Sequence, residues 1–198
     1  MFHNIKAYYY RMMPHLTQAD WQVLEERLTI KTYKKGDCIV KQGEVCNYVY
    51  FINVGFLRFY KLIDGKDIST GFIGASEYVS SYDSFLKRQP AFENLEVLED
   101  AELHCLSYDD MQFLYKHYPV YQMFGRVIAE QLFIWIVDRS NELLLLTPEQ
   151  RYENIIKNEP ELLQRVPQYM LASYIGVTPE HLSRIRKKMM TKSIDIYQ

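Results

Sequence analysis

Two side chains of opposite charge lie one helical turn apart near the C-terminal end, in the stretch TPEHLSRIRKKM. Glu180 and Arg184 are four residues apart, so a helix would place both on one face. A guanidinium can donate two parallel hydrogen bonds to the O6 and N7 atoms of guanine, and a carboxylate can accept one from the cytosine amino group. The pair therefore has the chemistry of side chains that read base edges in the major groove of DNA.

The residues around this pair predict two short helices joined by a tight turn. Gly176 suits the left-handed conformation that ends a helix, Thr178 can cap the next helix, and Pro179 fits its first position. Both helices have an apolar face at helical spacing, made by Leu171, Ala172 and Ile175 in the first and by Leu182, Ile185 and Met189 in the second. The pattern predicts a helix-turn-helix.

The outward side chains of this hairpin are the candidate DNA contacts. His181 and Ser183 could reach a base or a phosphate, and the basic residues that follow would supply sequence-independent attraction. The full predicted set is Gln168, Thr178, Pro179, Glu180, His181, Ser183, Arg184, Arg186, Lys187 and Lys188. The competing interpretation is a helical hairpin that ends in a solvated basic face.

Charge is distributed unevenly along the chain. The net charge is −2, which gives no reason to expect a generally basic nucleic-acid binder. Residues 1–146 hold 15 Lys and Arg against 19 Asp and Glu, whereas residues 147–198 hold 8 against 6. The positive field is thus local to the C-terminal part, where such a hairpin would need it.

The residues that precede the hairpin predict a β-rich domain flanked by helices. Residues 17–28 have helical periodicity, and residues 33–107 form short apolar runs separated by glycines. Asp64–Gly65 favours a two-residue hairpin turn, and two strands are expected to join near residues 53–55. The predicted fold class is α+β, with an N-terminal antiparallel β-roll that resembles a jelly roll.

A long helix is expected from residue 120 to residue 146. It is apolar on two faces, so it needs two partners, one of which could be the same helix of a second subunit. The predicted dimer interface consists of Val120, Phe124, Gly125, Ile128, Leu132 and Trp135. The alternative is a central helix buried within a monomer. Charged and polar residues interrupt the apolar run, so the sequence interpretation is that the helix is not a membrane span.

Thr147 begins a capping box, with Pro148 at the first helical position and Gln150 at the third. This helix start marks the boundary between the long helix and the C-terminal domain. The expected division is residues 1–118, a long helix over 119–146, and a helix-turn-helix domain over 147–198. The last residues, TKSIDIYQ, leave room for at most a stub of a wing, so the wing is expected to be reduced.

Together these features resemble the Crp–Fnr superfamily of bacterial transcription regulators. The supporting stretches are KKGDCIVKQGEVCNYVYFINVGFLRFYKLIDGKD, similar to the family's glycine-punctuated roll, and IGVTPEHLSRIRKKM, similar to its recognition helix. The resemblance implies a cyclic-nucleotide-binding-like sensor domain, a dimerisation helix and a homodimer on a pseudo-palindromic operator in double-stranded DNA. It also makes RNA polymerase a candidate partner. Pro179 stands where many relatives carry arginine, so the target sequence should differ.

The region that corresponds to the family's phosphate cassette departs from its pattern. Glu77 has no preceding glycine, the expected arginine is missing near QPAFEN, and Lys87 and Arg88 do not fit the spacing. Cyclic AMP is therefore not expected as a ligand, no cofactor is identified and the effector is unknown. The cysteine cluster of iron–sulfur relatives is also absent.

Other function classes fit the sequence less well. Cys38, Cys46 and Cys105 have no metal-ligand spacing and suggest a reducing compartment, and no signal peptide is recognised, so a cytoplasmic protein is expected. A cupin-like metal enzyme needs clustered histidines, and only His104 is expected on a strand, so the protein is predicted not to be an enzyme. A regulatory or interaction module that binds protein or a small ligand without reading DNA remains the alternative function.

Overall fold

The computed structural model describes residues 2–195, with side chains described through residue 190. The chain divides into two compact units. The first contains residues 1–62 and 70–131, and the second contains residues 63–69 and 132–198. The predicted three-part division of the chain stays a prediction.

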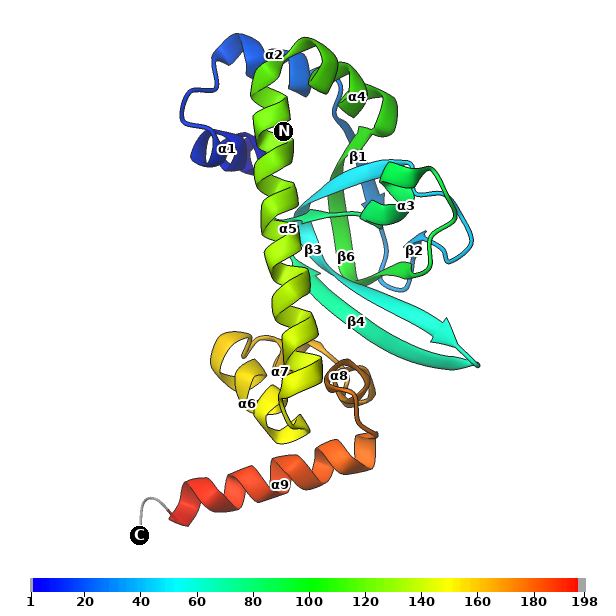
Figure 1. Cartoon of the computed structure of the whole chain (residues 1–198), viewed down its shortest axis with the longest axis vertical. Coiled ribbons are helices and arrows are strands. Elements are labelled where there is room, and N and C mark those ends of the chain that lie inside the picture. Colours follow the sequence, from blue (N-terminus) through cyan, green and yellow to red (C-terminus); the bar gives the residue numbers. More distant parts are fainter. Residues whose placement is uncertain (1, 196–198) are drawn as a thin grey trace. The chain divides into compact units, whose positions relative to one another are not determined.

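The first unit is built around a six-stranded sheet (Figure 1). Its strands run in the order β1-β6-β3-β4, while β2 also pairs with β6 and β5 with β3. The pairings of β6 with β1, β2 and β3, and of β5 with β3, are antiparallel. The strands are β1 (Thr29–Tyr33), β2 (Cys38–Val40), β3 (Tyr48–Ile63), β4 (Lys66–Gly74), β5 (Tyr78–Val79) and β6 (Asn94–Ser107). The predicted α+β class with an antiparallel β-roll is confirmed.

The turn between β3 and β4 has the predicted geometry. Asp64 and Gly65 are the only residues between the two strands, and their φ angles are 50° and 74°. A two-residue turn with positive φ at both positions matches the right-handed twist of the strands it joins. The Asp-Gly dipeptide thus specified both the place and the type of this hairpin.

The expected junction of two strands near residues 53–55 is wrong. One strand, β3, runs through this segment, and its register against β6 shifts between Ile52 and Leu57. At Gly55, φ is +122°, and an added Cβ would lie 2.6 Å from Cβ of Ala101. Glycine here allows a bulge and a close approach of two strands, which the sequence pattern could not distinguish from a turn.

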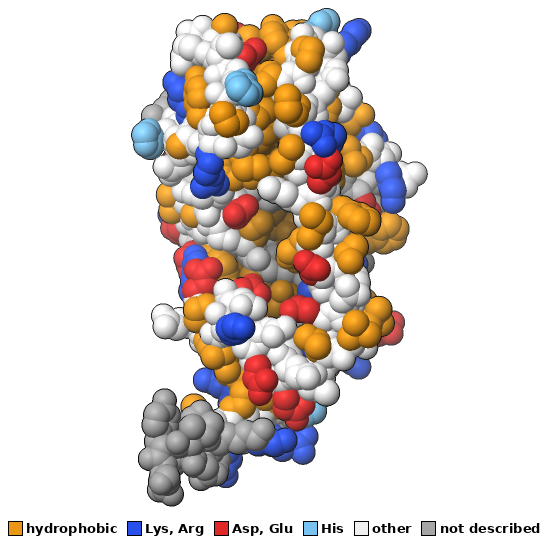
Figure 2. Space-filling view, turned by 60° about the vertical axis from the view of Figure 1, so that its left-hand side comes forward, with side chains coloured by type: hydrophobic (Ala, Val, Ile, Leu, Met, Phe, Trp, Pro, Cys, Tyr) orange, Lys and Arg blue, Asp and Glu red, His pale blue; other side chains and the backbone are white. Residues whose placement is uncertain are grey.

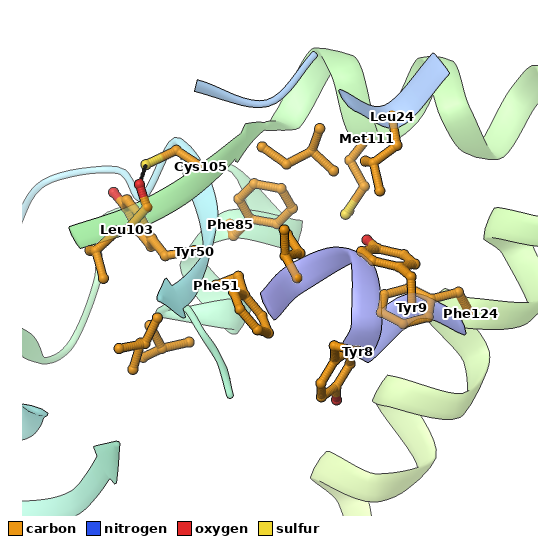
Figure 3. Close-up of a cluster of buried hydrophobic side chains, with 14 of the residues drawn as sticks. Tyr8, Tyr9, Leu24, Tyr50, Phe51, Phe85, Leu103, Cys105, Met111 and Phe124 are labelled. Atoms are coloured by element: carbon orange, nitrogen blue, oxygen red, sulfur yellow. Dashed lines mark hydrogen bonds between the residues drawn. The ribbon is translucent and has the colours of Figure 1, made fainter. Parts of the chain in front are cut away.

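Helices surround the sheet of the first unit and fill its core with aromatic rings. They are α1 (His3–Met12), α2 (Gln18–Glu25), α3 (Tyr82–Lys87), α4 (Tyr108–His117) and the first part of α5 (Pro119–Leu145). Thr17 forms a capping box with Asp20 at the start of α2. Figure 3 shows Tyr8 and Tyr9 of α1 beside Phe124 of α5, with Phe51 and Phe85 nearby in the same core. Burial of these rings accounts for much of the stability expected of this unit.

The second unit is helical. It contains the last part of α5, then α6 (Pro148–Asn158), α7 (Leu162–Arg165), α8 (Gln168–Ile175) and α9 (Pro179–Asp195). The predicted capping box of Thr147 and Gln150 is present at the start of α6. Helix α9 continues through residues 191–195, where the sequence left room for a stub of a wing, and residues 196–198 lie outside the described residues.

Candidate nucleic-acid interface

The turn between α8 and α9 has the geometry that the sequence predicted. Gly176 follows α8 with φ +79°, a left-handed conformation that its missing Cβ makes accessible. The Thr178 hydroxyl accepts a hydrogen bond from the His181 N–H at 3.2 Å and so caps α9. Ala172 is completely buried, as is Leu182, so the two helices pack through their apolar faces. The local arrangement is that of a helix-turn-helix.

The candidate DNA-contacting side chains are accessible. Eight of the ten are exposed, and the other two, His181 and Arg186, are partly buried. Figure 2 shows Lys and Arg side chains gathered around α9, at the bottom of the view. The N-terminal end of α9 also carries the positive end of the helix dipole, which adds to the attraction for phosphate.

The carboxylate of Glu180 interacts with the beginning of its own helix. Its pKa is lowered, first by a hydrogen bond from its own backbone N–H, then by the Thr178 hydroxyl and by the positive charge of Arg184. Each of these interactions favours the ionised form. Glu180 is therefore an acceptor at neutral pH, and Arg184 contributes to its electrostatic environment, as expected for a pair on adjacent turns.

A shallow depression lies at this end of the hairpin. It is lined by side chains from the starts of both helices, namely Gln168, Tyr169, Pro179, Glu180 and Ser183. The Gln168 side-chain amide donates to the carbonyl oxygen of Pro179 at 3.4 Å. Tyr169, 55% exposed, was missed by the sequence analysis, although its place beside Gln168 at the start of α8 was a usable signal.

The predicted dimer residues fall into two groups. Val120, Ile128 and Leu132 are partly exposed, and Trp135 is 49% exposed. Val120 and Ile128 also pack against the core of their own subunit, so Leu132 and Trp135 are the more accessible two.

Phe124 and Gly125 make contacts within their own subunit, and their place in the interface stays a prediction. Phe124 is 7% exposed, because its ring packs in the core of its own subunit. A Cβ on Gly125 would lie 2.2 Å from the Tyr115 hydroxyl oxygen, so this glycine allows close approach of α4 within the subunit. The predicted interface residues thus include some that face the core of the subunit and some that are accessible.

The C-terminal half of α5 exposes a nearly continuous apolar surface. The exposed side chains are Phe133, Ile134, Trp135, Ile136, Val137, Leu143, Leu144 and Leu145. By length and hydropathy alone, α5 is sufficient to cross a membrane. Membrane spans and subunit interfaces share that composition, and charged Arg126, Glu130, Asp138, Arg139 and Glu142 along α5 favour an interface.

The part of the roll that corresponds to a phosphate cassette contains acidic and already bonded side chains. The Arg88 guanidinium donates to the carbonyl oxygen of Cys46 at 2.8 Å and to Oδ1 of Asn47 at 2.6 Å. The Ser81 hydroxyl, fully buried, donates to Glu93 at 3.4 Å, and burial raises the pKa of Glu93. A carboxyl group offers no positive charge to a cyclic phosphate, and Arg88 is engaged with its own chain.

No three His, Cys, Asp or Glu side chains among the described residues are arranged to hold a metal ion. Cys38, Cys46 and Cys105 are all free thiols. His104 is 1% exposed, and neither of its ring nitrogens has a hydrogen-bond partner. Its ring packs between those of Phe2 and Phe51, which is the environment of a core side chain.

Comparison with known proteins agrees with this geometry. The family model of the cyclic nucleotide-binding domain matches residues 30–118. No curated protein matches the chain in sequence.

Several solved structures share the architecture. The c-di-GMP-responsive regulator CLP of Xanthomonas campestris is 20% identical, with a TM-score of 0.72 over 89% of this chain and 93% of that one. A protein from Eubacterium rectale described as a regulator of the Crp/Fnr family is 17% identical, with a TM-score of 0.74 over 93% and 88%. FixK2 of Bradyrhizobium japonicum is 20% identical, with a TM-score of 0.68 over 84% and 86%. With a roll, a long helix and a helix-turn-helix in the same order, the chain shares the fold of these solved structures, and its residues 30–118 match the model of the cyclic nucleotide-binding domain.

Proposed function

We propose that the protein is a sequence-specific DNA-binding transcription regulator that acts as a homodimer. The observation that carries this proposal is the surface of α9, where Glu180 and Arg184 are exposed on adjacent turns of a helix packed as a recognition helix. Arg184 is proposed to read a guanine and Glu180 a cytosine, while Lys187 and Lys188 attract phosphates. Gln168, Thr178, Pro179, His181, Ser183 and Arg186 complete the proposed contact surface, and Tyr169 is added to it.

Dimerisation is proposed to occur through the accessible face of α5. Its C-terminal half exposes large apolar side chains that water solvates poorly, and a second copy of the same helix would bury them. Ile128, Leu132 and Trp135 lie at spacings of four and three, which suits a seam between two helices. A dimer would present two α9 helices to a pseudo-palindromic site, with half-sites about one DNA turn apart.

The β-roll is proposed to sense something other than cyclic AMP. Glu93 and Ser81 occupy the region where a cyclic phosphate would need cations and free N–H donors, and Arg88 is engaged with its own backbone. Titration of the purified protein with cyclic AMP should therefore show no saturable binding in a calorimeter. Saturable binding at micromolar concentration would contradict this part of the proposal.

The decisive experiment is selection of DNA by the protein itself. The protein should enrich one pseudo-palindromic sequence from a randomised duplex pool, and DNA fragments recovered with it from its native cell should carry the same sequence. An interaction module without DNA reading would enrich no sequence in either experiment. RNA polymerase remains a candidate partner, because a bound regulator must act on transcription through it.

A further inference from the structure

Arg151 joins the ends of two helices of the second unit. Its Nε donates to the carbonyl oxygen of Ile175, the last residue of α8, at 2.8 Å. Its Nη1 donates to the carbonyl oxygens of Leu146 at 2.7 Å, Leu143 at 3.2 Å and Glu142 at 3.4 Å. These carbonyls lie at or just beyond the end of α5, where helical backbone donors run out, although the Leu146 N–H also donates to the Glu142 carbonyl oxygen at 3.2 Å. One guanidinium, 9% exposed, thus satisfies carbonyls of both α5 and α8.

Arg139 makes a second connection between the same two helices. It lies on α5, where its Nη1 pairs with Glu142 at 3.1 Å, and its Nη2 donates to the carbonyl oxygen of Tyr174. The guanidinium carbon lies 3.8 Å from the centroid of the Tyr174 ring, so cation–π attraction adds to the hydrogen bond. Tyr174 is 6% exposed, which keeps this contact away from water.

Both arginines act directly beside the turn of the helix-turn-helix. Tyr174 and Ile175 are the last two residues of α8, and Gly176 begins the turn that leads to α9. A Cβ added to Gly176 would lie 3.6 Å from Nη2 of Arg151, so the guanidinium reaches as far as the turn itself. Because only three residues separate Ile175 from α9, the place of the α8 end determines where the recognition helix starts.

We infer that Arg151 and Arg139 are positioning residues that hold α9 in a fixed orientation relative to the C-terminal part of α5, and so set the half-site separation that the dimer reads. This inference rests on the proposed DNA-binding function. Neither side chain is assigned a contact with DNA. Their effect would be geometric. Each α9 helix keeps its preference for the base sequence of a half-site, while the two arginines set the distance between the two α9 helices of the dimer.

The test uses charge-conserving variants, because lysine keeps the positive charge but lacks the planar fork that can bond several carbonyls. The variants are Arg151→Lys and Arg139→Lys, in the full-length protein. The control is Arg126→Lys, since Arg126 lies on α5 in an exposed pair with Glu130. Each protein is titrated with a duplex enriched by the wild type, with duplexes whose half-sites are moved apart or together by one base pair, and with a single half-site.

The expected result is a change confined to the paired sites. The wild type should prefer one half-site spacing. In each variant the ratio of full-site affinity to half-site affinity should be about tenfold lower than in the wild type, because two linked contacts gain affinity only where the geometry allows both. Half-site binding should stay within about twofold of the wild type, and Arg126→Lys should match the wild type throughout.

Two outcomes overturn the inference. One is an unchanged spacing preference and full-site advantage in both folded variants, and the other is an equal loss at the half-site, which would show that the arginines only stabilise the hairpin. If Arg151→Lys does not fold, Arg139→Lys tests the inference alone, because Arg139 makes fewer hydrogen bonds than Arg151 and its loss should disturb folding less. Failure of the wild type to bind any duplex specifically would instead refute the proposed function.

Discussion

The ring of Phe124 stacks on the ring of Tyr9, with centroids 4.2 Å apart and planes inclined by 27°. The contact joins α5 to α1 in one subunit and forms part of the aromatic core of the first unit (Figure 3). It shows that the N-terminal part of α5 uses its apolar inward face for its own subunit. The accessible interface is therefore expected to lie further along the helix, around Leu132 and Trp135.

Replacing Phe124 by alanine should lower the free energy of unfolding by about 3 to 5 kcal/mol, because it removes a buried ring and leaves a cavity in the core. Denaturant unfolding followed by circular dichroism measures this loss. Phe92→Ala is the comparison, since that side chain is 69% exposed and lies outside the proposed interface, and it should cost much less. A stable Phe124→Ala protein that no longer dimerises would restore the interface role that the sequence suggested for Phe124.

Placing charges at Leu132 and Trp135 should break the dimer. The double substitution Leu132→Glu and Trp135→Glu would bury two like charges against their copies, which is unfavourable in an apolar interface. Sedimentation equilibrium should show the wild type as a dimer and the variant as a folded monomer. Gln131→Glu is the control, because its side chain is exposed beside the proposed seam. A variant that remains dimeric would place the interface elsewhere.

Arg184→Ala should weaken binding to the selected DNA by about 1–3 kcal/mol and remove discrimination at one base pair. Lys187→Ala and Lys188→Ala should weaken binding to all duplexes alike and reduce the dependence of the affinity on salt, because each removes one phosphate contact. Titrations at several salt concentrations separate the two effects. An operator preference that survives Arg184→Ala would end the assignment of that residue.

Gly55 and Gly65 have positive φ angles but different surroundings, so they form a matched pair. Gly65→Ala should cost about 1 kcal/mol, because the new Cβ meets nothing within 4 Å and only the backbone is strained. Gly55→Ala should cost about 3 kcal/mol, since its Cβ would also overlap Ala101. Thermal unfolding of both variants checks the order. Equal losses would show that backbone strain alone acts at Gly55.

His104 should make the protein less stable in mild acid. Burial lowers its pKa below the ordinary value of 6.5, more strongly than Glu102 raises it. Between those two pKa values the unfolded chain binds a proton that the folded chain does not. The contribution of His104 to stability is therefore fully present above about pH 6.5 and is lost as the pH falls through the folded pKa.

The comparison for His104 is His104→Phe, which keeps a ring of similar shape between Phe2 and Phe51 but cannot titrate. The difference in unfolding free energy between the two proteins should vary with pH below about 6.5 and be constant above it. A difference that is independent of pH would show that His104 titrates normally in the folded protein.

Local features of the chain were predictable because single residues decide them. Asp64–Gly65 fixed a hairpin turn, Thr17 and Thr147 fixed two helix starts, and Gly176 fixed the turn that leads into α9. Each depends on a backbone angle or a capping hydrogen bond within a few positions. The shared face of Glu180 and Arg184 on α9 was predictable for the same reason, since the two residues lie four positions apart on one helix.

Only the tertiary structure decided which apolar residues face which partner. Periodicity identified α5 as apolar on two faces, but it could not show that Phe124 meets Tyr9, that Gly125 meets Tyr115, or that Gly55 meets Ala101. Those neighbours lie many residues away, and an apolar side chain can be buried by its own domain or by a second chain. The bonds from Arg139 and Arg151 to the end of α8 were hidden too, because a backbone carbonyl accepts a hydrogen bond whatever side chain its residue carries.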